Sequence, residues 1–324
     1  MSAVTRLVDS ALEVSVVGSF TSVGCNVRSK LDHWDAAAGR RDLTGRTVLV
    51  TGATSGIGLA AALRLARLGA SVRFLARNEA RAEDARARIV DAAGGGADVA
   101  YDLADMSDLD AVRGFATRFA AANEKLDVLL HNAGALSRDF RRAPDGTELT
   151  LATHVLGPFL LTSLLLPALR RAAPGRVITM SSGGMYTQRL DLDDLEMDRS
   201  HYDGRVAYAR AKRAQVVLNR EWARRFDRTE VVFHAMHPGW VDTPGVESGL
   251  PGFYRVMRPL LRTPDQGADT AVWLASDLEP LRSTGDFWHD RRRRGEHRLP
   301  WTAREENGGG LWELCEKRTG REPG

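Results

Sequence analysis

The feature that most constrains this chain is a glycine-rich turn between a short apolar run and a helical one. Residues 46–58 read RTVLVTGATSGIG, and the leucine- and alanine-rich run 59–69 follows at once. A strand that turns so sharply into a helix needs residues without a Cβ, because its backbone must approach a phosphate at the helix N-terminus. A turn with no ligand is the alternative. The strand before it and the helix after it favour a dinucleotide loop built on Gly52, Gly56 and Gly58.

Short apolar runs continue to alternate with helical runs along the chain. Strand patterns recur at 71–76, 97–103, 126–131, 176–181, 230–236 and 284–290. Helical patterns lie between them at 107–121, 147–172, 205–226 and 265–277. Strands that are apolar throughout and alternate with helices form a parallel sheet covered on both faces. With right-handed crossovers the sequence predicts an α/β fold: a doubly wound, seven-stranded parallel sheet of the Rossmann type in a single domain.

This domain is predicted to span residues 45–290, between an N-terminal extension (1–44) and a C-terminal tail (291–324). Apolar residues of the extension fall at helical spacing: they are Val4, Leu7, Val8 and Leu12. Such a helix either docks on its own domain or lies on a membrane surface as a peripheral contact. The basic run Arg291–Arg294 is expected to form a solvated face rather than to contact an anionic surface.

Composition narrows the setting in which the protein works. Hydrophobic residues make up 43% of the 324 residues, which is ample for a packed core. The formal net charge of +3 gives no support for a nucleic-acid partner. Cys25 and Cys315 lie near opposite ends of the chain and can form neither a disulfide framework nor a spaced metal site. We therefore expect a cytoplasmic protein without a bound metal, either a monomer or a homodimer.

The end of the second strand bears on the choice between the two nicotinamide cofactors. An acidic residue there holds the ribose 2′-hydroxyl of NAD, whereas an Arg can hold the 2′-phosphate of NADP. Here the strand ends at Ala76 and is followed by Arg77, with no acid at its tip. Arg77 as an ordinary solvated charge is the alternative. The sequence predicts NADP(H) in preference to NAD(H).

A tyrosine and a lysine four residues apart mark the predicted helix 205–226. Tyr208 and Lys212 lie on one helix face at this spacing, so their side chains are neighbours. A free phenol titrates near pH 10, and a nearby ammonium favours its ionised form, which brings its pKa toward the range useful for general acid–base catalysis. The same pair on an exposed helix, without a catalytic purpose, is the alternative.

Three further segments follow strands at the same edge of the predicted sheet. Ser181 and Ser182 close the fifth strand, where a hydroxyl can polarise a substrate carbonyl. HNAG at 131–134 ends the fourth strand, and HPGWVDTP at 237–244 follows the sixth. Ligands of parallel α/β folds bind at this carboxyl edge. These three segments and the glycine loop are all expected at this edge, which indicates one combined site for cofactor and substrate.

Together these motifs resemble the short-chain dehydrogenase/reductase family. Its catalytic serine, tyrosine and lysine match Ser182, Tyr208 and Lys212. Its cofactor-binding positions match Gly52, Thr54, Ser55, Gly56, Ile57, Gly58, Arg77, Asp102, Leu103, Asn132, Ala133, Gly134, Tyr208, Lys212, Pro238, Gly239, Val241 and Thr243. Within the family, the runs SSGGM, DGRVAYARAKR and HPGWVDTPGV resemble the corresponding sequences of the retinol-dehydrogenase-like branch. Members of that branch usually prefer NADP(H).

The resemblance implies an oxidoreductase that interconverts an alcohol and an aldehyde or ketone with a nicotinamide cofactor. In that mechanism Ser182 polarises the substrate oxygen and Tyr208 is the general acid or base. Lys212 holds the nicotinamide ribose and lowers the pKa of Tyr208. The cofactor itself supplies the redox chemistry.

His154 departs from the family pattern. In the run THVLGPFLLT it stands where the family has an asparagine that bends the helix and steadies a water beside the catalytic lysine. A histidine can anchor the same water or exchange protons itself. Alternatively it is a structural residue and the proton relay is impaired. That outcome would support a different function, a non-catalytic or weakly active NADP(H)-binding regulatory protein.

Two segments, about 183–204 and 245–262, are expected to cover the substrate. The second mixes apolar and basic residues, which indicates a lipophilic small-molecule carbonyl or alcohol. Tyr202 lies in the first segment, but the residue four positions after it is Val206 rather than a lysine. We therefore reject Tyr202 as the acid.

Overall fold

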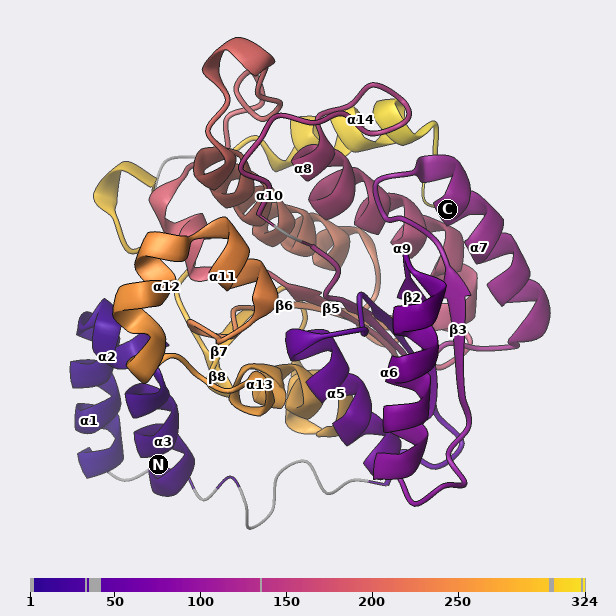
Figure 1. Cartoon of the computed structure of the whole chain (residues 1–324), viewed down its shortest axis with the longest axis horizontal. Coiled ribbons are helices and arrows are strands. Elements are labelled where there is room, and N and C mark those ends of the chain that lie inside the picture. The colour runs from indigo at the N-terminus through magenta and orange to yellow at the C-terminus, as the bar shows by residue number, and fades with distance from the viewer. Residues whose placement is uncertain are drawn as a thin grey trace.

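The computed structural model describes residues 3–32, 34, 42–134, 136–302, 306–321 and 323. Its centre is an eight-stranded sheet in the order β3-β2-β1-β4-β5-β6-β7-β8 (Figure 1), parallel except for the last pair. The strands are β1 (Thr47–Thr51), β2 (Ser71–Ala76), β3 (Val99–Leu103), β4 (Val128–His131), β5 (Gly175–Met180), β6 (Val231–Met236), β7 (Phe287–His289) and β8 (Arg292–Arg293). The order reverses between β1 and β4, so the predicted single-domain, doubly wound α/β fold is confirmed.

The sheet has one strand more than the seven predicted. After β7 the chain reverses through Asp290 and Arg291, whose φ angles of +52° and +55° suit a tight hairpin turn. Arg292 and Arg293 then pair antiparallel with β7. An arginine run has no apolar alternation, so nothing in its pattern indicates a strand.

The expectation of a solvated arginine face is wrong for most of the run Arg291–Arg294. The side chains of Arg291, Arg292 and Arg294 are 7%, 11% and 9% exposed. Arg291 pairs with Asp269, and the other two share Asp9. These carboxylates come from distant parts of the chain, and they replace the water that an exposed guanidinium would bind.

Helices cover both faces of the sheet. On one face lie α5 (Gly56–Arg67), α6 (Glu79–Ala92) and α13 (Pro264–Ser276). On the other lie α7 (Leu109–Ala122), α9 (Gly157–Arg170), α10 (Gly204–Arg225) and α14 (Gly308–Thr319). Each layer buries its apolar side chains against the strands, which is the dominant stabilising contribution in a fold of this kind.

The C-terminal helix α14 is part of the core rather than an appendage. Leu311, Trp312 and Cys315 are buried on its inner side. The Trp312 ring packs edge-on against Trp222 and Phe159, with ring centroids 4.6 and 5.0 Å away. Of the predicted terminal segments, residues 1, 2, 33, 35–41, 303–305, 322 and 324 lie outside the described residues.

The helical stretch that precedes β5 is irregular. It consists of α8 (Leu149–Leu151), a π-helical turn (Ala152–Leu156) and then α9. The stretch Leu149–Arg170 has the length and composition of a membrane-spanning helix. However, 78% of its apolar window is buried inside the protein, as in the core helix of a globular domain.

The N-terminal extension folds back as three helices, α1 (Ala3–Val14), α2 (Val16–Phe20) and α3 (Ser22–Leu31), near the β7–β8 edge of the sheet (Figure 1). Arg28 of α3 is fully buried and pairs with Asp9, Glu13 and Asp290 at 2.8, 2.9 and 2.7 Å. Buried guanidinium groups need such partners, because water no longer solvates them. Of the two alternatives for the extension, the structure shows docking on its own domain.

Candidate active site

The glycine loop has the geometry that a phosphate site requires. It leaves β1 at Gly52 and enters α5 at Gly56, with φ angles of +72° and +54° that favour glycine. A Cβ at Gly58 would lie 2.3 Å from the Gly52 carbonyl oxygen, so no side chain fits there. Ser55, the N-cap of α5, makes no side-chain hydrogen bond to the first turn. The N–H groups and the positive end of α5 are therefore available to an anion.

A second loop is tied to the first by hydrogen bonds. Thr51 Oγ1 accepts from the backbone N–H groups of Asn132 and Ala133, both at 3.0 Å. The Asn132 side-chain amide donates to the carbonyl oxygens of Thr51 and Gly52 at 3.0 and 2.9 Å. Asn132 thus holds the glycine loop in shape. Thr51 was not among the predicted site residues, although its place at the tip of β1 is a signal for it.

His154 lies directly behind the segment Asn132–Gly134. A Cβ at Gly134 would come within 2.1 Å of His154 Cε1, so the imidazole occupies the space that a side chain would need. The same ring packs edge-on against Tyr208, with ring centroids 5.3 Å apart and an interplanar angle of 88°. The helix remains distorted at this point, because His154 lies inside the π-helical turn. The helix is thus irregular at the position where the resemblance implies a bend.

The strand tips of β2 and β3 form the far end of the site. Arg77, just after β2, has a side chain that is 69% exposed and pairs with Asp105 at 3.5 Å. The register of the two strands places Ala76 beside Leu103, which is 46% exposed. Asp102 pairs with Arg118 at 3.3 Å. An accessible guanidinium and an exposed apolar side chain thus stand at neighbouring strand tips.

The segment after β6 closes over the glycine loop. Gly239 has a φ of +81°, and a Cβ there would lie 2.3 Å from the Arg262 Nε. Thr243 is the N-cap of α11 (Pro244–Gly249), and its methyl group would lie 3.2 Å from a Cβ on Gly56. Of the predicted residues in this segment, Thr243 is thus brought next to Gly56, while Gly239 packs against Arg262. Val241 is buried beneath them.

Ser182, Tyr208 and Lys212 come together at the carboxyl end of β5. The Ser182 hydroxyl is a hydrogen-bonding neighbour of the Tyr208 phenol. Lys212 Nζ lies 5.4 Å from the centroid of the Tyr208 ring. The hydroxyl of Ser181 donates to the Lys212 carbonyl oxygen at 2.9 Å, so Ser181 binds the backbone of α10. The geometry therefore favours Ser182 over Ser181 as the residue that meets a substrate.

Burial dominates the electrostatics of the pair. It raises the pKa of Tyr208, and the hydrogen bond from Ser182 opposes this shift without overcoming it. Burial also lowers the pKa of Lys212 to about 7. The pKa of Tyr208 is thus raised overall in this structure, not lowered as the resemblance implies.

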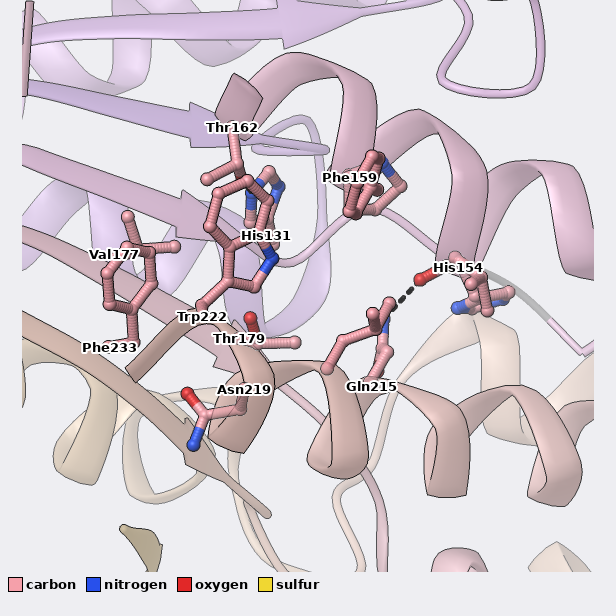
Figure 2. Close-up of a pocket in the computed structure, with 13 residues that line it drawn as sticks. His131, His154, Phe159, Thr162, Val177, Thr179, Gln215, Asn219, Trp222 and Phe233 are labelled. Carbon is pink, nitrogen blue, oxygen red and sulfur yellow. Dashed lines mark hydrogen bonds between the residues drawn. The ribbon is translucent and has the colours of Figure 1, made fainter. Parts of the chain in front are cut away.

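Two neutral oxygens hold the Lys212 ammonium. Its Nζ donates to the Met180 carbonyl oxygen at 2.8 Å and to Gln215 Oε1 at 3.1 Å. Figure 2 shows that the other end of the Gln215 amide reaches the His154 carbonyl oxygen, at 2.8 Å. Gln215 was missed by the sequence analysis. Its position three residues after Lys212, on the same helix face, was the available signal.

An open cleft of about 490 Å³ lies one helical turn before Tyr208. It lies between the loop after β4, the start of α10 and the segment that joins α11 to α12 (Pro251–Met257). Four apolar or aromatic side chains line it together with three charged ones: Leu136, Tyr202, Leu250 and Phe253, with Arg138, Asp203 and Arg205. Both segments predicted to cover the substrate therefore contribute to its wall. Tyr202 takes part as a lining residue, with its hydroxyl donating to the Ser137 carbonyl oxygen at 3.2 Å.

These features agree with three comparisons. Residues 46–249 match the short chain dehydrogenase family. Human dehydrogenase/reductase SDR family member 12 is 41% identical over 251 residues, which cover 77% of this chain and 78% of that protein. Mouse retinol dehydrogenase 14 is 35% identical over 292 residues, covering 85% of this chain and 86% of that protein.

A solved structure extends the agreement to the fold. A short chain dehydrogenase from Escherichia coli CFT073, complexed with NADPH, aligns with a TM-score of 0.64 at 26% identity. The alignment covers 78% of this chain and 99% of that chain. With the geometry described above, these findings show that the chain belongs to the short-chain dehydrogenase/reductase family and is an oxidoreductase of alcohols and carbonyl compounds.

Proposed function

We propose that this protein uses NADP(H) to interconvert an alcohol and an aldehyde or ketone on a lipophilic small molecule. The observation that carries the proposal is the group Ser182, Tyr208 and Lys212, gathered at the sheet edge beside a glycine loop with an open helix N-terminus. The group combines a hydroxyl donor, a proton donor and a cation in one place. This is what carbonyl reduction requires of a protein.

Each residue of the group has a distinct role in the proposed reaction. Bound NADP(H) supplies or accepts a hydride at nicotinamide C4. Ser182 donates a hydrogen bond to the substrate oxygen and orients it. Tyr208 gives its phenolic proton to that oxygen in reduction and takes it back in oxidation. Lys212 has three donors, of which two are used within the protein, so one is left for a ribose hydroxyl.

Tyr208 enters a reduction in its protonated form. Its phenol is protonated at neutral pH, all the more because burial raises its pKa, and can donate its proton to a carbonyl oxygen.

The choice of NADP(H) rests on Arg77. Its guanidinium is mostly exposed and stands at the tip of β2, where the ribose of a bound dinucleotide lies in doubly wound folds. The pair that it makes with Asp105 is loose and solvated, so a phosphate can replace the carboxylate at little cost. The relative from Escherichia coli is complexed with NADPH, which agrees with this assignment.

The lipophilic substrate is supported by the apolar part of the cleft at the start of α10. Leu136, Leu250 and Phe253 line this part, while Arg138, Asp203 and Arg205 make the rest of the wall charged. The apolar part can bind a ligand by removing apolar surface from water. The name of the mouse relative, a retinol dehydrogenase, points to the same class of compound.

Turnover measured with a matched variant tests the proposal. Purified protein is expected to oxidise NADPH in the presence of decanal or benzaldehyde, read as loss of NADPH absorbance. Tyr208→Phe is expected to lower kcat by about a hundredfold or more while NADPH still binds. Tight NADPH binding without turnover would support the regulatory alternative instead. Failure to bind either dinucleotide would overturn the cofactor assignment.

A further inference from the structure

The Gln215 side chain bridges two parts of the active site that are far apart in sequence. Its Oε1 accepts from Lys212 Nζ at 3.1 Å, and its Nε2 donates to the His154 carbonyl oxygen at 2.8 Å (Figure 2). All three residues are buried. The orientation of the amide follows from its partners: an ammonium can only donate and a carbonyl oxygen can only accept. A side-chain oxygen must therefore face Lys212, and an N–H must face His154.

The His154 carbonyl oxygen lies in an irregular part of its helix. It belongs to the π-helical turn Ala152–Leu156, and the residue four positions after it is Pro158, which has no backbone N–H. The Gln215 amide gives this buried oxygen a hydrogen-bond donor from another helix, α10.

The bridge also connects both neighbours of the Tyr208 ring. Lys212 lies over the ring at 5.4 Å, and the His154 imidazole meets it edge-on at 5.3 Å. The ammonium keeps its place through two neutral acceptors, the Met180 carbonyl and Gln215. Without the Gln215 oxygen, the buried ammonium would lose one of these acceptors, and the neutral amine would be favoured.

The titratable groups around the bridge are few in the part of the chain that the structure describes. Tyr208 faces it from α10 and His154 from the π-helical turn. His131 of β4 faces it across a small cavity that it shares with Gln215 and Asn219. His131 binds the Thr162 hydroxyl through Nε2 at 2.7 Å. Burial lowers the pKa of His131 and raises that of Tyr208, so both side chains are neutral near pH 7. Lys212, 5.4 Å from the Tyr208 ring, is the neighbour that can carry a positive charge beside the phenol.

We propose that Gln215 is a positioning residue, which tethers the Lys212 ammonium to the His154 carbonyl and so sets the pH at which Tyr208 exchanges its proton. The inference rests on the proposed function of Tyr208 as general acid and base. In this proposal the Gln215 amide links Lys212 to the π-helical turn that contains His154. Because an amide does not titrate, it can hold the lysine at any pH without itself gaining or losing a proton.

Two variants cut the bridge in different ways. Gln215→Met has similar volume and no polar group, so the ammonium loses an acceptor. Gln215→Glu keeps an acceptor for Lys212 but has no N–H for the His154 carbonyl, and its negative charge offsets that of the ammonium. Both changes lower the positive potential at the phenol. The matched control is Asn219→Leu, one helical turn further along α10, equally buried and lining the same cavity.

The titration of Tyr208 can be read without any substrate. The phenolate absorbance of each protein, minus that of the same protein carrying Tyr208→Phe, isolates this tyrosine from the other four. Both Gln215 variants are expected to move its midpoint up by about one pH unit. The alkaline limit of kcat for NADPH-dependent reduction of decanal should move with it, and kcat at pH 7 should fall about tenfold.

The control and the two readouts separate the outcomes. Asn219→Leu is expected to leave the midpoint in place and kcat within about twofold of the parent. An unmoved midpoint in both Gln215 variants, or an equal shift in Asn219→Leu, would overturn the tether. If the parent protein turns over no carbonyl compound yet the midpoint still shifts, the proposed function fails while the tether stands.

Discussion

Arg77 is the residue whose chemistry decides between the two cofactors. Arg77→Asp should repel a 2′-phosphate and accept a hydrogen bond from a 2′-hydroxyl instead. We expect the Kd for NADPH to rise about ten- to a hundredfold, in keeping with the loss of one or two charge-assisted hydrogen bonds, while NADH binding improves. Titration with both dinucleotides measures this. Arg88→Asp makes the same charge change on α6 and controls for the effect of net charge on NADPH binding. An equal rise in the Kd for NADPH in Arg88→Asp would refute the specific role of Arg77.

Gly134 is a residue with no room for a methyl group. Gly134→Ala would drive a Cβ to 2.1 Å from His154 Cε1, so the imidazole or the loop must move. We expect a loss of about 1–3 kcal/mol in the free energy of unfolding, the usual cost of overpacking, measured by urea denaturation. Adding His154→Ser should recover most of it, as a double-mutant cycle would show. Gly114→Ala in the middle of α7 is the control, where alanine should be neutral or stabilising.

At the scale of elements, the docking of α1–α3 depends on a buried carboxylate. Asp290 accepts from Arg28 at 2.7 Å and from Arg262 at 2.5 Å, and both guanidinium groups are almost fully buried. Asp290→Asn would leave two buried cations short of a partner. We expect it to destabilise the fold by about 3–5 kcal/mol and to make the extension sensitive to protease.

The control for that prediction is an ion pair whose arginine is half exposed. Arg46 pairs with Asp127, which also accepts from Lys125 and from the Thr47 N–H. Arg46→Gln should cost less than about 1 kcal/mol, because the Asp127 carboxylate keeps these other partners. A loss of similar size in Arg46→Gln and Asp290→Asn would contradict the view that burial makes the Asp290 pairs important.

Most elements could be predicted because their signals are local. The buried parallel strands are continuous apolar runs, and the glycine loop after β1 and the tyrosine–lysine spacing on α10 are each recognised within a few residues. Strand β8 and the docking of α3 could not be predicted. They depend on ion pairs such as Arg28 with Asp290, which join residues 262 positions apart. The hydrogen bond from Gln215 to His154 joins residues 61 positions apart, so it could not be predicted for the same reason.

At the scale of the whole molecule, buried histidines make stability depend on pH. Burial lowers the pKa of His131 and His289 to about 3 and holds the pKa of His237 well below its usual value. In the unfolded chain these groups titrate near pH 6.5. The unfolded state therefore binds more protons as the pH falls below about 6.5, and it is favoured.

We expect the free energy of unfolding to be constant with respect to these groups above pH 7 and to fall on acidification toward pH 4. Each histidine contributes up to about 1.4 kcal/mol per pH unit. Urea denaturation at several pH values measures the slope. His131→Gln keeps a polar group near Thr162. It should reduce that slope by the contribution of one histidine, up to about 1.4 kcal/mol per pH unit. An unchanged slope would show that His131 is not neutral in the folded protein.

The pairing of Arg28 with Asp290 also sets an order of events during synthesis. Arg28 leaves the ribosome long before its partner Asp290, which is made 262 residues later. At about 5–20 residues per second, this ion pair waits roughly 13 to 50 s before it can form. Until then Arg28 can pair with Asp9 and Glu13 of the same extension, and contacts such as that of Phe20 with Trp240 can form earlier. A chain that stops before residue 290 would therefore lack the carboxylate that ties Arg28 to the edge of the sheet.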